Sequence, residues 1–458
     1  MLLQAGRYLV KILLKILLRN DHIHLTRFFI RFFVRQRTSI GTDIHVKTNS
    51  LKNKLVVLAL HEDYFRGDLE ALASNSAVAI LVIDVGLQYL IKDAFYGHSP
   101  DPVEHYQVGS NPTVDESKVR CQEYLFKVLR RLSHRYEISV VVSPNVRYVE
   151  DLDWCVASEA CNIPSVVLYR EGLLMYPRAY EGSVNRHKRF GSYLGTHIAV
   201  HNEIMKKMFL ESGFVRNDQV TVCGAPRMDN FVQQSFLTDE SLNQNQEKQV
   251  LVLYFSPGFR QETIIDSDGL ERPPGVPKEL FSRVMRKIIL MAKSHPDVKF
   301  LLKPKKEDQS ITDFYELADR LGVDLQQIHN LEINDRYDIH EAILCSHVVL
   351  GLQTTAILEA AVAARHVVMP FLLDYRNSEW SKRFGYKSYL HLFSVPEDEE
   401  QMEFMLLSAL NSDVLNVSCI EEKRALFSQW ISPLGQSATD NTVKMLSNIS
   451  KCRVSTEL

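Results

Sequence analysis

Hydrophobic residues along the chain gather in short continuous runs that alternate with stretches in which apolar positions recur every three to four residues. The runs LVVLAL (55–60), AVAILVID (77–84) and ISVVVSP (138–144) are typical of strands buried on both faces. Helical periodicity marks the stretch 116–135. Strands that alternate with helices predict an α/β protein with parallel sheets covered on both faces.

The same alternation continues to about residue 226. Further strands are expected at 163–172, 196–202 and 219–226, and helices at 154–161 and 203–212. The polar stretch 239–248 has no apolar periodicity and is interpreted as a linker. A second sheet then begins with QVLVLYFSPGFR at 249–260 and continues with a strand at 299–308. Helices are expected at 280–293, 311–321 and 339–345.

The stretch 347–371, HVVLGLQTTAILEAAVAARHVVMPF, predicts a strand, a turn, a helix and another strand. The first strand ends at Gly351, and Gln353, Thr354 and Thr355 open the helix. In a parallel unit of this kind, the helix N-terminus lies at the carboxyl edge of the sheet, where free N–H groups favour an anion. Glu359, one turn later, can accept hydrogen bonds from sugar hydroxyls. The alternative is a capping threonine and a solvated glutamate.

Length and composition narrow the class of protein. A chain of 458 residues exceeds one typical core and indicates two domains. A hydrophobic content of 45% and a charged content of 24% are ordinary for globular proteins. The formal net charge of −3 excludes a globally basic nucleic-acid binder. The seven cysteines form no Cys-x-x-Cys pair, which favours buried free thiols in a reducing compartment over disulfides or a zinc site.

The N-terminus differs from the rest of the chain. Basic residues recur every fourth position among Leu, Ile and Phe, at Arg7, Lys11, Lys15 and Arg19 and again at Arg27, Arg31 and Arg35. Charges this frequent exclude a transmembrane helix, and no cleavage site of a secretory signal follows. Two basic amphipathic helices on an anionic membrane surface fit residues 1–37, and the protein would then be cytoplasmic and peripheral at the inner face of the membrane. The alternative is a helix pair packed on the protein body.

The loop YREGLLMYPR (169–178) follows a predicted strand, at the edge where functional groups collect. Glu171, beside Arg170, is the candidate general base. Its alternative role is an ion pair with Arg170 or Arg178. His187, in the basic cluster 186–189, is a second candidate catalytic residue, although charge runs are usually solvated faces.

Several phrases in the second half resemble a known family. GAPRMDNF (224–231) resembles the Gly-x-Pro-Arg-x-Asp signature of CDP-glycerol glycerophosphotransferases and related surface-carbohydrate biosynthesis proteins. FSPGFR (255–260) is similar to their strand-loop, usually Ala-Pro-Thr-Trp-Arg, and the stretch 351–370 to their donor-site helix. SPLGQSATDNTVKML (432–446) resembles the segment before their last helix. The phrases cover the chain from about residue 219 to its end.

The resemblance implies a GT-B fold, in which two Rossmann-like domains face each other across a cleft. We accordingly expect an arm at 1–38, an acceptor domain at 39–238, a nucleotide-donor domain at 249–431, and a C-terminal helix and tail at 432–458. The residues expected to bind the donor are Gly258, Arg260, Lys303, Lys305, Gln353, Thr354, Thr355 and Glu359. Further residues expected at the cleft are Arg170, Gly224, Pro226, Arg227 and Asp229.

The resemblance also implies a reaction without a bound metal or other cofactor, in which a sugar or polyol phosphate moves from a nucleotide-activated donor, such as a nucleotide-sugar or CDP-polyol, to a glycan or lipid-linked acceptor. Glu171 would deprotonate the acceptor hydroxyl from across the cleft. Related proteins often have His-Gly where this chain has Glu171-Gly172, and Arg-x-His-Pro where it has Lys303-Pro304-Lys305. Glu171 then replaces the histidine as base, or the chain binds sugar nucleotides without turnover. Two alternative functions are a nucleotide-sugar 2-epimerase and a non-catalytic carbohydrate-assembly protein.

Overall fold

The structure is a computed structural model that divides into two compact units. It describes residues 30–454, except for 98–99, 108, 110, 172, 239–247, 256–263, 266–270, 273–275, 305–310 and 412–416. Unit 1 consists of Met1–Gly172, Val184–Asp229 and Ser432–Leu458, and unit 2 of Leu173–Ser183 and Asn230–Ile431. Unit 2 therefore starts before the expected linker, and the C-terminal segment belongs to unit 1 and is not a separate part.

Unit 1 is built on a sheet of eight strands in the order β2-β1-β4-β3-β5-β6-β7-β8. The strands are β1 (Val34–Arg37), β2 (Asp43–Ile44), β3 (Leu55–Ala59), β4 (Val78–Ile83), β5 (Val140–Ser143), β6 (Ser165–Tyr169), β7 (His197–Val200) and β8 (Val220–Val222). The strands from β4 to β8 are parallel, and β1 and β2 extend the sheet in the antiparallel direction. The chain order reverses between β3 and β5, which makes the carboxyl ends of these two strands the switch point of the sheet.

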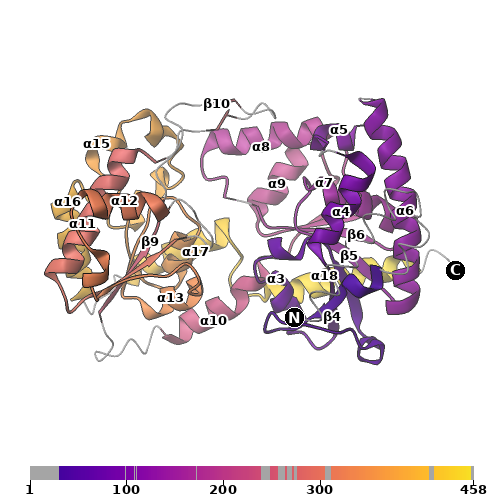
Figure 1. Cartoon of the computed structure of the whole chain (residues 1–458), viewed down its shortest axis with the longest axis horizontal. Helices are drawn as coiled ribbons and strands as arrows, with labels where there is room; N and C mark the ends of the chain where they lie inside the picture. The colour runs from indigo at the N-terminus through magenta and orange to yellow at the C-terminus, as the bar shows by residue number, and fades with distance from the viewer. Residues whose placement is uncertain are drawn as a thin grey trace. The chain divides into compact units, whose positions relative to one another are not determined.

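Both faces of this sheet are buried, as the continuous apolar runs predict. Alternate residues of β3 enter different cores: Val56 and Leu58 pack in one cluster, Val57 and Ala59 in the other. The helices of unit 1 are α3 (Asp68–Ala73), α4 (Val85–Tyr96), α5 (Pro102–Tyr106), α6 (Pro112–Tyr136), α7 (Val149–Ala160), α9 (Glu203–Glu211) and α18 (Ala438–Val454). Helix α18, yellow in Figure 1, joins the second cluster through Met445 and Leu446.

Unit 2 contains a five-stranded parallel sheet in the order β13-β12-β9-β14-β15. The strands are β9 (Gln249–Leu253), β12 (Lys299–Lys303), β13 (Leu331–Ile333), β14 (Val348–Leu350) and β15 (His366–Val368). Numbered along the unit this is the order 3-2-1-4-5 of a Rossmann sheet, whose switch point lies between β9 and β14. A separate ribbon pairs β10 (Ile264–Ile265) with β11 (Glu271–Arg272). The two Rossmann-like units confirm the predicted fold class.

The helices of unit 2 cover its sheet. They are α10 (Asp229–Thr238), whose first residue belongs to unit 1, α11 (Lys278–Ser294), α12 (Thr312–Arg320), α13 (Ile339–Cys345), α14 (Ala356–Val362), α15 (Leu373–Arg376), α16 (Glu399–Leu410) and α17 (Val417–Trp430). Helix α8 (Pro177–Phe190) contributes residues to both units. The strand, helix and strand expected between 347 and 371 are β14, α14 and β15, which confirms that prediction.

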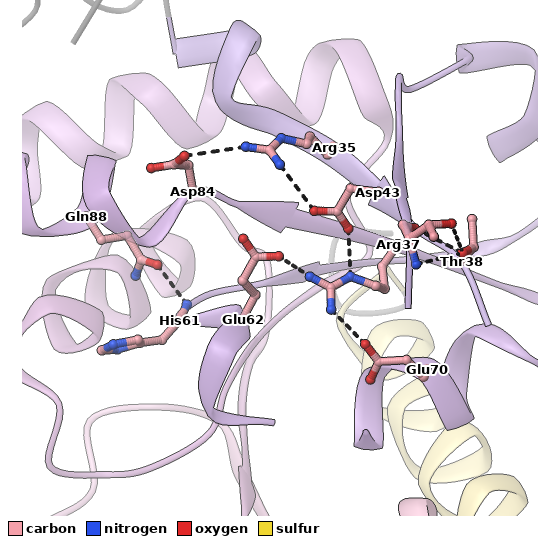
Figure 2. A network of polar contacts seen from close by, with 10 residues as sticks. Arg35, Arg37, Thr38, Asp43, His61, Glu62, Glu70, Asp84 and Gln88 are labelled. Carbon is pink, nitrogen blue, oxygen red and sulfur yellow. Dashed lines mark hydrogen bonds and ion pairs between the residues drawn. The ribbon is translucent and has the colours of Figure 1, made fainter. Parts of the chain in front are cut away.

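The N-terminal segment differs from the expectation of helices up to residue 37. Residues 30–33 form a short 3-10 helix, and β1 follows, paired with β4. Figure 2 shows why this basic strand is stable in the sheet: Arg37 contacts the carboxylates of Asp43, Glu62 and Glu70, and Arg35 those of Asp43 and Asp84. The expected membrane-binding helices otherwise lie outside the described residues.

No helix in the described part of the chain is long and apolar enough to cross a membrane. None of the seven cysteines, all of which lie among the described residues, is in a disulfide. Cys121, Cys155 and Cys223 are buried, as the prediction of buried thiols requires, whereas Cys345 and Cys452 are exposed. Cys345 ends α13, and the apolar residues around it belong partly to α13 and partly to β14, so they do not form one buried run that would include the thiol.

Candidate functional site

The switch point of unit 2 brings the carboxyl ends of β9 and β14 together. Gly351 follows β14, and a Cβ added there would lie 2.9 Å from Leu253 Cδ1 and 3.1 Å from Leu253 Cβ. Its N–H donates to the carbonyl oxygen of Val368 in the next strand (3.2 Å). Glycine thus lets the loop leave the sheet edge in close contact with β9, at the position where open α/β sheets bind ligands.

The predicted donor loop lies at this edge. Gln353 and Thr355 are exposed and Thr354 is half-buried. The buried Tyr386 donates its hydroxyl hydrogen to the carbonyl oxygen of Thr354 (2.6 Å), which fixes the turn before α14. Thr355 is the N-cap residue of α14, but its side chain makes no capping hydrogen bond. Its hydroxyl is therefore not used by the helix, whereas Thr354 Oγ1 accepts a hydrogen bond from the N–H of Ala356 (3.4 Å), so the threonine that caps the helix start is Thr354.

Glu359 faces the interior of unit 2. Its side chain is only 7% exposed, and Oε2 lies 3.5 Å from Nε2 of His340 on α13. The imidazole of His340 also stacks on the ring of Phe231, with 4.3 Å between the ring centroids. This setting suits orientation of His340 better than direct contact with ribose hydroxyls. Sequence reasoning missed His340 because its partners are distant in the chain.

Lys303 ends β12 at the same edge. Its ammonium donates to the carbonyl oxygens of Pro304 (2.9 Å) and Asp335 (2.8 Å), so one of its three N–H groups has no acceptor among the described residues. Burial lowers the pKa of Lys303, and the charges of Asp335 and Asp338 oppose this shift. Three other predicted donor-binding residues, Gly258, Arg260 and Lys305, lie outside the described residues.

In unit 1, the predicted pair Arg170 and Glu171 follows β6. Arg170 Nη2 lies 3.8 Å from Glu171 Oε1, and the glutamate side chain is 45% exposed while that of the arginine is 5% exposed. The ion pair considered as an alternative is therefore present at long distance. The carboxylate nevertheless has access to solvent, as a general base needs.

His187 lies elsewhere, in the core of unit 1. Its ring packs against those of Tyr169, Phe190, Phe209 and Phe214, with centroid distances between 4.8 and 6.2 Å. The residue is 1% exposed. A histidine enclosed by aromatic rings contributes packing, so we do not include His187 in the proposal below.

The signature GAPRMD joins parts of unit 1. A Cβ on Gly224, whose φ is +87°, would lie 2.7 Å from Ala438 Cβ and from Ser432 Oγ. Pro226 is buried. Arg227 pairs with the buried Asp68 on α3, with 3.1 Å between Nη1 and Oδ2.

The last residue of the signature, Asp229, caps helix α18. Its carboxylate accepts hydrogen bonds from the N–H groups of Ala438 (2.9 Å) and Thr439 (2.8 Å) and from the Ser437 hydroxyl (3.0 Å). The geometry therefore assigns Gly224 and Asp229 to the attachment of the C-terminal segment.

A second polar group in unit 1 escaped the sequence analysis. His61 follows β3 at the switch point, in a left-handed conformation (φ +55°), and is buried. Its N–H donates to Gln88 Oε1 (2.7 Å), which Figure 2 shows, and Gln88 Nε2 donates to Asp151 Oδ1 (2.7 Å). Nδ1 of His61 lies 3.6 Å from Asp151 Oδ2. The sequence pattern that points to His61 is the same as for Glu171, because His61 comes directly after the apolar run LVVLAL of a parallel strand.

Within the described ranges, no group of three or more His, Cys, Asp and Glu side chains is placed to hold a metal ion. The expectation of a reaction without a metal stays untested by this observation, because parts of both strand-end regions are not described.

Comparison with known proteins gives one family and several solved structures. Residues 177–325 match the sequence model of the family CDP-Glycerol:Poly(glycerophosphate) glycerophosphotransferase. No curated protein matches the chain in sequence. A UDP-GlcNAc 2-epimerase from Neisseria meningitidis bound to UDP-GlcNAc is 14% identical, with a TM-score of 0.45 over 86% of this chain and 100% of that chain.

Two further solved structures have a comparable sequence identity and TM-score to this chain. A UDP-GlcNAc 2-epimerase from Methanocaldococcus jannaschii is 13% identical, with a TM-score of 0.47 over 86% of this chain and 99% of that chain. A variant of the wall teichoic acid polymerase TagF is 14% identical, with a TM-score of 0.46 over 95% of this chain and 97% of that chain. The resemblance found in the motifs is confirmed: from α8 to residue 325, the chain is similar to the CDP-glycerol glycerophosphotransferase family.

Proposed function

We propose that the chain transfers a polyol phosphate or a sugar from a nucleotide-activated donor to a surface-glycan acceptor, which is lipid-linked. The observation that carries the proposal is the match of residues 177–325 to a glycerophosphotransferase family. The matched range contains the first two strands of the unit 2 sheet, β9 and β12, and the segments that follow them. A family of transferases supports group transfer from an activated donor more directly than the alternatives of epimerisation or passive binding.

The donor is proposed to bind at the carboxyl edge of unit 2. The exposed Thr355 and Gln353, together with the remaining N–H of Lys303, offer donors to a diphosphate. Fixed donors stabilise a leaving nucleotide more than the ground state, because negative charge grows on it as the bond breaks. Gly258, Arg260 and Lys305 are proposed as further donor contacts from the sequence alone.

Acceptor activation is assigned to unit 1. The carboxylate of Glu171 would take the proton of an acceptor hydroxyl while the acceptor oxygen bonds to the transferred group and the nucleotide departs. Support for this role is the exposure of Glu171 beside a buried arginine, at the carboxyl edge of a parallel sheet.

Residues 1–29 are proposed to bind an anionic membrane surface and so to bring the enzyme to its acceptor at the inner face of the membrane. The support is the regular spacing of basic residues among apolar ones. Flotation of the full chain and of a chain that lacks residues 1–29, with vesicles of anionic lipid, tests this. Equal flotation of both proteins refutes it.

The donor site is tested by thermal unfolding with CDP, UDP, GDP and CMP. A ligand that binds the native state raises Tm by mass action, and we expect one of the four to do so. Thr355→Val should lower the affinity for that nucleotide by about fivefold, which corresponds to the loss of one hydrogen bond. Thr113→Val, at an exposed threonine of unit 1, is the matched control and should leave the affinity unchanged. If none of the four nucleotides shifts Tm, the proposed donor site is wrong.

A further inference from the structure

Arginines collect at the carboxyl edge of the unit 1 sheet. Arg147 comes four residues after β5, Arg170 directly follows β6, and Arg227 comes shortly after β8. Arg66 follows the short 3-10 helix that succeeds β3, in a left-handed conformation (φ +51°). Because the carboxyl ends of parallel strands meet at one edge, four residues distant in sequence become neighbours.

Side-chain contacts connect this arginine cluster (Arg66, Arg147, Arg170 and Arg227). The guanidinium of Arg170 lies over the ring of Tyr64 at 5.3 Å, and its Nη2 donates to the hydroxyl of Tyr148 (3.4 Å), the residue after Arg147. A Cβ added to Gly67, the residue after Arg66, would lie 3.4 Å from Cβ of Arg227. The four side chains therefore start from one region of the surface.

The electrostatics agree with this proximity. Burial, followed by the charges of Arg227 and Arg170, lowers the pKa of His201 well below its ordinary value. Partial desolvation and then the charge of Arg170 lower the pKa of Arg66. Cations that disfavour one another's charged form are stabilised by an anion between them.

The hydrogen-bonding capacity of the cluster is incompletely used. The side chain of Arg170 is 5% exposed, yet its Nε and Nη1 have no partner in the described part of the chain. Nε of Arg147 is also buried without a partner there. Buried donors without acceptors are costly, so a ligand that accepts from them would stabilise the site.

Carboxylates satisfy only part of the charge. Asp68 pairs with Arg227, and Glu171 lies 3.8 Å from Arg170. Within the described part of the chain, these are the two carboxylates that pair with the four guanidinium groups, so the cluster carries more positive than negative charge. Guanidinium forks approaching from several strand ends suit the oxygens of a tetrahedral group better than one planar carboxylate.

We propose that this arginine cluster of unit 1 binds a phosphate ester, separately from the nucleotide site of unit 2. Arg170 and Arg147 provide the buried donors and the exposed Arg66 an outer one. That the phosphate belongs to the acceptor rests on the proposed function, whereas anion binding itself does not. The site then places a phosphorylated acceptor next to Glu171, its candidate base.

The test uses the full chain in calorimetry with inorganic phosphate and with glycerol 3-phosphate, against chloride at equal ionic strength. Arg66→Gln and Arg147→Gln should each weaken phosphate binding by about tenfold, since a hydrogen bond to a charged group is lost. Arg216→Gln is the matched control, because Arg216 is 71% exposed and its ion pair among the described residues is with Asp218. Tm without ligand checks that each variant folds.

Saturating CDP distinguishes the two possible sources of the phosphate. Binding of glycerol 3-phosphate that CDP leaves unchanged, and that Arg66→Gln weakens, supports a separate acceptor site. Competition by CDP would assign the arginines to the donor and overturn the proposal. Equal phosphate affinities in the wild type, Arg66→Gln and Arg147→Gln, or no binding above the chloride control, would also overturn it. Failure of CDP to bind contradicts the proposed donor site only.

Discussion

Asp229, in a signature that resembles a family of transferases, is predicted to act on stability and not on substrate binding. Its carboxylate accepts hydrogen bonds from two free N–H groups at the start of α18 and from the Ser437 hydroxyl. Replacement by alanine removes these acceptors. Loss of a cap costs about 1 kcal/mol and loss of a carboxylate at a helix N-terminus up to about 1 kcal/mol more.

Together these effects predict that Asp229→Ala lowers the free energy of unfolding of unit 1 by about 2 kcal/mol. The corresponding fall in Tm is roughly 4–8 °C. Asp229→Asn, which keeps an acceptor oxygen but no charge, should lower the free energy of unfolding by about half as much. Asp218→Ala, at a side chain that is 71% exposed, is the control and should change Tm by less than about 2 °C.

The assay is thermal unfolding by circular dichroism, combined with hydrogen exchange of the amides of Ala438 and Thr439. Both amides should exchange faster in Asp229→Ala, because their acceptor is gone. Nucleotide affinity at 25 °C should equal that of the wild type. A variant with unchanged Tm and exchange but lost nucleotide affinity would show that Asp229 serves the substrate, and the reasoning would be refuted.

Two further predictions concern pH and packing. Burial, and next the charge of Asp43, raise the pKa of Glu62 to about 7, while Arg37 opposes the shift. The native state therefore binds more protons than the unfolded state between pH 4.5 and 7, and this group's contribution to stability falls as pH rises through that window. This group should lower the free energy of unfolding of the wild type, measured by chemical denaturation, by up to about 3 kcal/mol between pH 4.5 and 7.5. Glu62→Gln should lack this decrease, and parallel pH profiles of the two proteins would contradict the prediction. Gly351→Ala should cost about 1–3 kcal/mol in the free energy of unfolding and weaken nucleotide binding, because the new methyl meets Leu253; Leu253→Ala in the same chain should restore binding, and failure to do so would contradict the packing argument.

The sequence predicted most of both sheets because the strands are buried on both faces. Successive residues from Val56 to Ala59 pack alternately in two cores, so every position of the strand is apolar. This continuous run differs from the three-to-four-residue periodicity of the helices. The stretch 347–371 was predictable for the same reason, with Gly351 marking the turn. In such segments local pattern and tertiary environment agree.

Strand β1 could not be predicted because tertiary contacts override its local pattern. Arg35 and Arg37 look like the polar face of an amphipathic helix. They are accommodated in a strand because four carboxylates from other elements contact them, as Figure 2 shows. These belong to Asp43, Glu62, Glu70 and Asp84. The attachment of the C-terminal segment to unit 1 likewise could not be predicted from the sequence, because it depends on contacts between residues more than 200 positions apart.

The candidate site was predictable only as a set of strand ends. The rule that functional groups follow parallel strands pointed to Arg170, Glu171 and Thr355. It applied equally to His61, and to Arg147 shortly after β5, which were overlooked because no family phrase drew attention to them. His187 shows the reverse error: a charged run suggested an exposed residue, but helix α8 turns this position toward an aromatic core.

Nucleotide release is the direct measure of transfer from a nucleotide-activated donor. The full chain is incubated with CDP-glycerol or with UDP-sugars, with and without a lipid-linked glycan acceptor, and free nucleotides are quantified. The account predicts release that requires the acceptor: CMP for polyol phosphate transfer, or UDP for sugar transfer. Glu171→Gln should slow it by at least about a hundredfold. Release that does not depend on acceptor, or no release from any donor that binds, would contradict the account.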